Sequence, residues 1–202
     1  MFMETLNSST QSVTIPSSTS KTIYIYYHGE IDVPRVNTIV GIVTQIMANE
    51  KPECLYFLFS SNGGGVDAGI TLYNYLKSLP IELVMHNIGT IDSISNVIFM
   101  AGKKRYAAPH AVFMFHGVSM PYNGVLSLPQ LNEIRDRILN NHSTIAGIIC
   151  GGTKISDREI KRLFSEGQTK DVRFALQKGI IDEVQLPQIP QNALTVTINV
   201  NA

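Results

Sequence analysis

The sequence predicts a mixed α/β sandwich whose strands run mostly parallel. Runs of β-branched and aromatic residues alternate with segments whose apolar residues recur at helical spacing, in the order β-α-β-α-β-α. Parallel strands in this order need right-handed crossovers, which place the helices against the sheet. With 202 residues, the chain is long enough for one domain with a sizeable core.

As far as residue 116, the expected elements are separated by clear stop signals. Pro52 breaks the chain before the second strand, and Pro80 ends the second helix because proline cannot continue helical hydrogen bonding. The expected strands are 22–27, 55–59, 81–88, 105–108 and 112–116, and the expected helices are 36–49, 66–79 and 93–101.

After residue 116 the pattern becomes helical. A long helix is expected at 127–149, a second begins at Ser156 with Glu159 three residues later, and a third spans 172–178 with Gly179 just beyond its end. A strand then follows at 180–184.

The sequence divides into three parts. Residues 1–21 are rich in Ser and Thr and are expected to form a flexible N-terminal arm. Residues 22–184 form the folded domain, and 185–202 form a C-terminal tail. Within that tail, 195–200 alternate like a strand but have no obvious partner in the domain.

The composition disfavours several classes of partner. With 16 basic and 16 acidic residues, the chain lacks the basic footprint of a nucleic-acid-binding protein. No apolar run approaches the roughly 18 residues of a membrane span, so no membrane partner is expected. The cysteines and histidines show no ligand spacing, so no metal is assigned. Without a secretory signal pattern near residue 1, the expected location is the cytoplasm.

Three apolar runs end in residues that chemistry can use. The run at 57–59 leads to Gly63, Gly64 and Gly65, whose backbone N–H groups can approach a ligand closely. The next leads to Ser93 at a strand-to-helix junction, and the third ends at His116. A donor loop, a nucleophile and a base are the groups that acyl transfer requires.

Each of these features also has a simpler structural interpretation. Ser93 could serve only as a helix N-cap, and His116 could be an ordinary histidine at a strand end. Ser95 is a competing nucleophile, although it would lie deeper in the helix. The glycine run lacks the Lys-Ser/Thr of a phosphate-binding loop, so that interpretation is rejected.

Five collinear segments resemble the ClpP family of serine peptidases, within the ClpP/crotonase fold. The resemblance covers about 23–184. The segments are SNGGGVDAG at 61–69, IGTIDS at 88–93, AGKKRY at 101–106, MFH at 114–116 and GIID at 179–182.

The resemblance implies a fold, an activity and a set of site residues. The fold would consist of repeated ββα units with a mostly parallel sheet and a protruding helical handle at about 124–165. Ser93 would be the nucleophile of a serine endopeptidase acting through an acyl-enzyme, and His116 its base. The backbone N–H groups of Gly64 and Ile94 would form the oxyanion hole.

The third member of the catalytic triad is where the sequence departs from the family. The family's Asp lies fifteen residues before the closing Asp, a register that falls on Gly167. Glu166 is adjacent and is assigned as the acid, with Asp171 as the alternative. Asn62, Asp92 and Ser95 also replace the usual family residues. A catalytically weak or inactive ring subunit is therefore one alternative, and a crotonase-type acyl-CoA enzyme is another.

The resemblance also implies partners. The subunits are expected to form face-to-face stacked rings, a tetradecamer of two heptamers, in which handles pack against handles. An AAA+ unfoldase would deliver peptide or unfolded protein and would alone use ATP, so no cofactor is expected in this chain.

Overall fold

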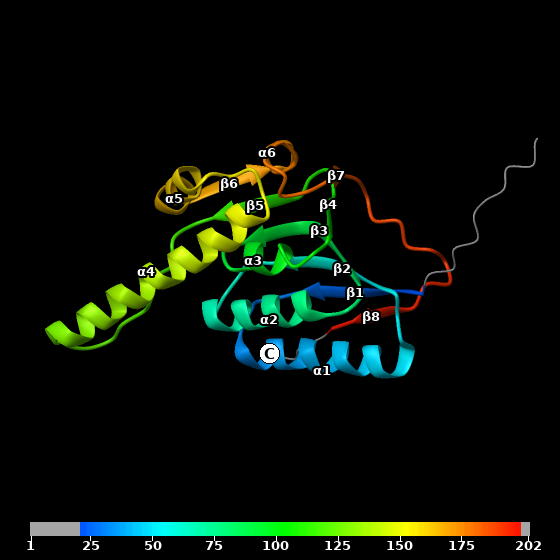
Figure 1. Cartoon of the computed structure of the whole chain (residues 1–202), viewed down its shortest axis with the longest axis horizontal. Helices are drawn as coiled ribbons and strands as arrows, with labels where there is room; N and C mark the ends of the chain where they lie inside the picture. The colour runs from blue at the N-terminus through cyan, green and yellow to red at the C-terminus, as the bar shows by residue number, and fades with distance from the viewer. Residues whose placement is uncertain (1–20, 199–202) are drawn as a thin grey trace, which may run out of the picture.

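A computed structural model describes residues 21–198 as one mixed sheet with helices packed against it (Figure 1). The strands are β1 Thr22–His28, β2 Cys54–Ser61, β3 Glu82–Asp92, β4 Lys104–Ala107, β5 Val112–Phe115, β6 Gln168–Asp171, β7 Glu183–Val184 and β8 Thr195–Thr197. The helices are α1 Val33–Glu50, α2 Val66–Ser78, α3 Ser95–Phe99, α4 Leu128–Gly151, α5 Asp157–Glu166 and α6 Val172–Gln177.

The sheet branches at β3. The main path runs β6-β5-β3-β2-β1-β8, while β4 pairs with β3 and β7 with β4. The first half of β3 pairs with β4 and its last three residues pair with β5. All pairs are parallel except β5 with β6. The predicted mixed α/β fold with a mostly parallel sheet is confirmed.

Capping residues explain where several helices begin. Asp32 accepts a hydrogen bond of 2.8 Å from the Arg35 N–H at the start of α1. Ser156 accepts one of 3.3 Å from the Glu159 N–H at the start of α5, as the sequence predicted. Beyond α6, Gly179 has a φ of 68°, the left-handed conformation expected of a glycine after a helix end.

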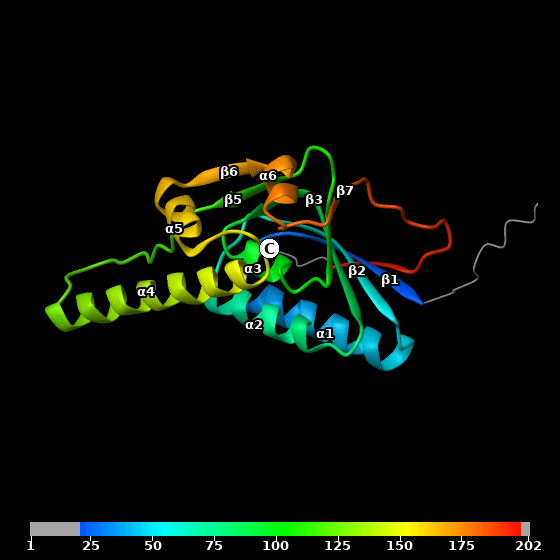
Figure 2. The ribbon, with the colours of Figure 1, turned by 45° about the horizontal axis from the view of Figure 1, so that its top comes forward.

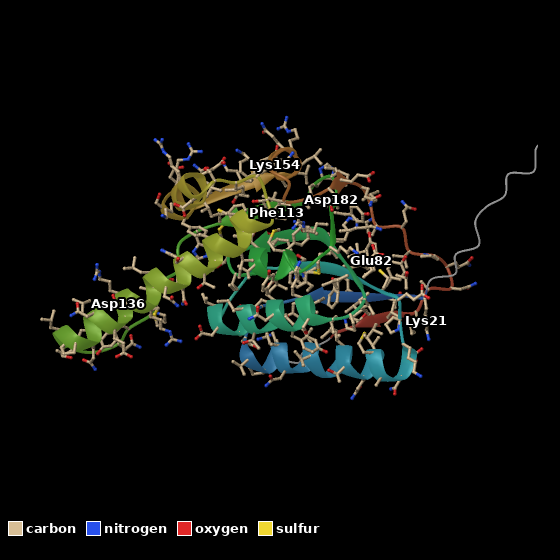
Figure 3. All side chains as sticks on the ribbon, in the orientation of Figure 1. Lys21, Glu82, Phe113, Asp136, Lys154 and Asp182 are labelled. Carbon is tan, nitrogen blue, oxygen red and sulfur yellow. The ribbon has the colours of Figure 1, made fainter. Side chains whose placement is uncertain are left out.

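The core lies between the helices and the central strands. β2 is buried along nearly its whole length, as expected for a parallel strand covered on both faces. Phe113 of β5 is fully buried and packs edge-to-face on Phe99 of α3, with ring centroids 5.4 Å apart. Figure 3 shows Phe113 within the body, whereas Asp136 of α4 lies well away from it.

Helix α4 projects from the body, as Figures 1 and 2 show from two directions. Its buried residues, which include Ile145 and Ile149, lie toward its C-terminal end. Leu128 and Leu131 near its start are 71% and 50% exposed. None of the helices in residues 21–198 is long and apolar enough to cross a membrane.

The strand pattern that begins at residue 195 is confirmed at Thr195–Thr197, but the expectation that this strand has no partner in the domain was wrong. β8 pairs in parallel with β1, with Val196 opposite Ile25, and Ile198 is buried. The chain reaches this position along a connector that is hydrogen-bonded to β4 at one end and to β1 at the other. The Gln185 N–H donates to Ala107 O at 2.9 Å, and the Tyr24 N–H donates to Leu194 O at 2.9 Å. The predicted arm at 1–21 lies, apart from Lys21, outside the described residues.

Candidate active site

A cavity of about 70 Å³ lies beyond the carboxyl ends of β2, β3 and β5. It brings together four residues singled out in the sequence: Gly64, Ser93, Ile94 and His116. The ends of neighbouring parallel strands are where ligands bind in sheets of this kind. The rest of the lining is Val66, Phe115, Val118, Ser119, Ile145 and Phe164.

Ser93 occupies a strained turn between β3 and α3. Its φ is 56°, a left-handed value that side-chain-bearing residues seldom adopt. The turn is held in place because the Ser93 N–H donates to Met114 O at 2.9 Å, and Asn96 Nδ2 donates to Met114 O at 2.8 Å and to Ser93 O at 3.1 Å. Strain maintained by surrounding contacts is characteristic of functional positions.

The glycine loop approaches the backbone of two other segments too closely to carry side chains. A Cβ on Gly63 would lie 2.7 Å from Ser93 Cβ, and one on Gly64 would lie 2.2 Å from Ile31 O. Gly63 and Gly64 have φ values of 89° and 146°. Ile31 fixes the loop because its N–H donates to Gly63 O at 2.8 Å and its carbonyl accepts from Gly65 N–H at 2.7 Å.

Two backbone donors at the cavity are free. Within residues 21–198, the N–H groups of Gly64 and Ile94 donate to no other group. The N–H of Ser93, by contrast, donates to Met114 O. Both free donors belong to residues that line the cavity. Such donors can stabilise the oxyanion that forms when a nucleophile attacks a carbonyl.

His116 follows β5 and is half-buried. Its Nδ1 lies 2.8 Å from Gly117 O. A carbonyl oxygen can only accept, so Nδ1 carries a proton, and in the neutral ring the lone pair is then on Nε2. His116 and Ser93 share the cavity, but no hydrogen bond joins them in the described part of the chain; such contacts often tighten only when substrate binds.

The structure does not bring Glu166 to His116, contrary to the expectation for a triad acid. Glu166 is the last residue of α5 and is exposed, and its carboxylate accepts a hydrogen bond from Gln168 Nε2. The physical reason is Gly167, whose φ of 62° turns the chain into β6 and leaves Glu166 facing solvent.

The alternative acid, Asp171, is engaged at the start of α6. Its carboxylate accepts from the Phe174 N–H at 3.0 Å and pairs with Arg173 at 2.8 Å. These hydrogen bonds, the Phe174 N–H first, lower the pKa of Asp171. Asp171 therefore acts as a helix cap.

Ser95, the competing nucleophile, is fully buried. Its hydroxyl donates to Ser61 Oγ at 2.8 Å, and Ser61 Oγ also accepts from the Gly63 N–H at 3.2 Å. This pair of hydroxyls connects the glycine loop to α3. Among residues 21–198, no cluster of three or more His, Cys, Asp or Glu side chains could hold a metal ion.

Several residues around the site were not identified from the sequence. His142 of α4 accepts from the Val118 N–H at 2.7 Å, and Phe164 O accepts from the Gly117 N–H at 2.9 Å. His142 is distant in the chain and is not part of any motif, so its approach depends on how α4 packs. Ser61 had a weak signal, because it lies two residues before the glycine run.

Over most of its length, the chain is similar to known proteins. The model of the family described as Clp protease matches residues 7–188. The ATP-dependent Clp protease proteolytic subunit of Oltmannsiellopsis viridis is 28% identical over 77% of this chain and 80% of its own length. The protein of the same name from Bigelowiella natans is 30% identical over 63% of this chain and 66% of its own length. The one from Chlorella vulgaris is 27% identical over 77% of this chain and 77% of its own length.

Proposed function

This chain belongs to the Clp protease family, and from that premise we propose that it hydrolyses peptide bonds through an acyl-enzyme formed on Ser93. The observation that carries the proposal is the single cavity shared by Ser93, His116 and the two free backbone donors. The match to the family model confirms the sequence resemblance to the ClpP family, and the serine-peptidase activity follows from that membership.

The reaction follows from the positions of these groups. Ser93 Oγ attacks the peptide carbonyl carbon while His116 Nε2 takes the hydroxyl proton. The N–H groups of Gly64 and Ile94 hold the resulting oxyanion. The C–N bond then breaks, and His116 returns its proton to the leaving amine. Water next attacks the Ser93 ester; His116 takes the water's proton and delivers it to Ser93 Oγ as the peptide acid leaves.

The inactive-subunit and crotonase-type alternatives are not favoured. The three relatives named above are each called an ATP-dependent Clp protease proteolytic subunit. A crotonase-type enzyme would also have no need for a serine held in a left-handed turn beside a histidine that has a free Nε2. A strained serine in the same cavity as two free N–H donors is instead the arrangement that acyl transfer requires.

The assembly proposal rests on α4. Its apolar start is exposed, and Val125 just before it is 93% exposed, so a counterpart helix from a second ring would cover these side chains. We propose stacked rings, a tetradecamer of two heptamers, that receive unfolded protein from an ATP-using unfoldase. A native mass that corresponds to the 22.3 kDa chain at micromolar concentration, with peptidase activity retained, would contradict the rings.

A fluorophosphonate probe tests the chemistry directly. The probe phosphonylates serines that are activated by a neighbouring base, so we expect a single adduct on Ser93 by peptide mass mapping. The matched control is Ser93→Ala, which should give no adduct. An adduct on Ser95 in wild-type protein, or no adduct in protein of the native mass, would refute the assignment.

A further inference from the structure

We propose that the Gly117 carbonyl takes the place of the missing triad carboxylate, and that His142 holds the peptide that carries it. The inference rests on the proposed function, because it assigns positioning roles around the Ser93–His116 pair. It concerns one peptide unit, Gly117–Val118, which lies between two imidazole rings.

The first half of this arrangement is the hydrogen bond from His116 Nδ1–H to Gly117 O, 2.8 Å long. This bond fixes the tautomer of His116 and leaves Nε2 free to take the Ser93 proton. A triad carboxylate serves the same purpose and also stabilises the charged imidazolium. A carbonyl dipole supplies the orientation with less charge stabilisation, so it can support catalysis at a lower rate.

No described carboxylate competes for this position. Glu166 accepts from Gln168, Asp171 caps α6, and Asp92 accepts from the Thr90 hydroxyl. Within residues 21–198, the only hydrogen bond to the His116 ring is the one from Nδ1 to Gly117 O.

The second half lies on the opposite edge of the same peptide. The Val118 N–H donates to His142 Nε2 at 2.7 Å, so the sequence of groups is His116 Nδ1–H, the Gly117–Val118 peptide, and His142 Nε2. Hydrogen bonds in such a chain polarise one another, and accepting from the N–H makes the carbonyl a stronger acceptor. The Gly117 N–H is also fixed, by Phe164 O at 2.9 Å.

His142 is held for this role by its surroundings. Its ring lies on Phe164 with centroids 5.5 Å apart, and a Cβ on Gly117 would come within 3.1 Å of its Nε2. Because Nε2 accepts, His142 must be neutral with its proton on Nδ1. Burial favours this state by lowering the pKa of His142.

Two charged side chains of α5 lie in the same groove as His142. Asp157 and Lys161 of α5 line a groove together with His142 and pair with each other at 2.7 Å. On the other edge of the Gly117–Val118 peptide, the titratable group is His116. The two imidazoles are therefore linked through one peptide. If His142 Nε2 gained a proton, the Val118 N–H would lose its acceptor.

Two substitutions at position 142 test the proposal. His142→Phe keeps a ring on Phe164 but has no acceptor for the Val118 N–H, whereas the amide oxygen of His142→Gln can accept it. We expect His142→Phe to lower kcat about tenfold with little change in KM, and His142→Gln to recover most of the loss. The acid limb of the kcat profile should be less steep in His142→Gln than in wild type, because one of the two imidazoles no longer titrates. Ser143→Ala, the next residue on α4, is the matched control.

Three outcomes would overturn the inference: His142→Phe with wild-type kcat, His142→Gln as impaired as His142→Phe at equal native mass, or Glu166→Gln losing a hundredfold or more in kcat. The last would return the orienting role to a carboxylate. Failure of the proposed function would be observed separately, as wild-type protein that neither cleaves peptide nor accepts the fluorophosphonate on Ser93.

Discussion

The Ser95 hydroxyl lies 2.8 Å from the Ser61 hydroxyl, and this contact joins the two elements that carry the free backbone donors. Ser61 leads into the loop that contains Gly64, and Ser95 directly follows Ile94. The separation of the two N–H groups therefore depends partly on one buried hydrogen bond.

Replacing Ser95 by Ala should lower kcat several-fold without removing the nucleophile. The lost hydrogen bond should also reduce the free energy of unfolding by about 1 kcal/mol. Peptide cleavage and urea unfolding measure the two effects. If Ser95→Ala no longer reacts with the fluorophosphonate while Ser93→Ala still does, Ser95 is the nucleophile.

Ser93→Ala and His116→Ala should each reduce kcat by about a thousandfold or more, because nucleophile and base act as one unit. For the same reason the double variant should be hardly worse than either single one. Single-turnover cleavage of a model peptide gives the values. Additive losses in the double variant would show that the two residues do not act together.

Gly64→Val should lower kcat, and the loss of one oxyanion donor costs about 3 kcal/mol of transition-state stabilisation. A Cβ at this position would lie 2.2 Å from Ile31 O, so the loop must shift. Gly65→Ala is the matched control, because its Cβ would have only ordinary contacts at 3.6 Å and beyond. Equal kinetics in the two variants would contradict the role given to the loop.

Stability should rise with pH in a window below about 6.5, because of His86. This side chain is fully buried, with Nδ1 2.6 Å from Tyr56 Oη and Nε2 2.9 Å from Gln185 O, and burial lowers its pKa from 6.5. The unfolded chain then binds the proton more readily, so stability is lost as the pH falls from 6.5 toward the folded-state pKa. Urea unfolding from pH 5 to 8 measures the slope, and His86→Gln should reduce it. An unchanged slope would assign the effect to other groups, such as His142.

A chain that ends at residue 192 should have a lower melting temperature and aggregate more readily. Removing β8 exposes the edge of β1, whose backbone N–H and C=O groups can then pair with other chains. Light scattering during thermal unfolding measures both effects. Removing only residues 199–202 is the control; equal behaviour of the two truncations would mean that β8 contributes little.

Local signals in the sequence were sufficient for most of the fold. Helix caps such as Ser156, helix stops such as Pro80 and buried apolar strands act through neighbouring residues, so their elements were predicted within a few positions. β6 was missed because Gln168-Thr169-Lys170-Asp171 has no apolar alternation, and it becomes a strand only by pairing with β5. The partner of β8 was missed because parallel pairing between distant segments leaves no local pattern.

For the candidate site, the residues that lie in sequence motifs were predictable, but the residues around them were not. Gly64, Ser93, Ile94 and His116 lie in sequence motifs and do share a cavity. The surroundings of His116 were not predictable, because register alone placed a carboxylate near Gly167, whereas the fold turns Glu166 toward solvent. The approach of His142 to Val118 is set by the packing of α4, which no motif records.

The pairing of β8 with β1 has a consequence for biosynthesis. β1 leaves the ribosome well before β8, so its outer edge acquires a partner only after Thr195–Thr197 have been made. During most of translation the nascent sheet therefore presents an unpaired strand, with Tyr24 and Tyr26 on it, to the cellular environment. Closing the sheet is a contact of very long sequence separation and is expected to be slow. Molecular chaperones that shield strand edges would have the most effect on this protein in that interval, before β8 pairs with β1.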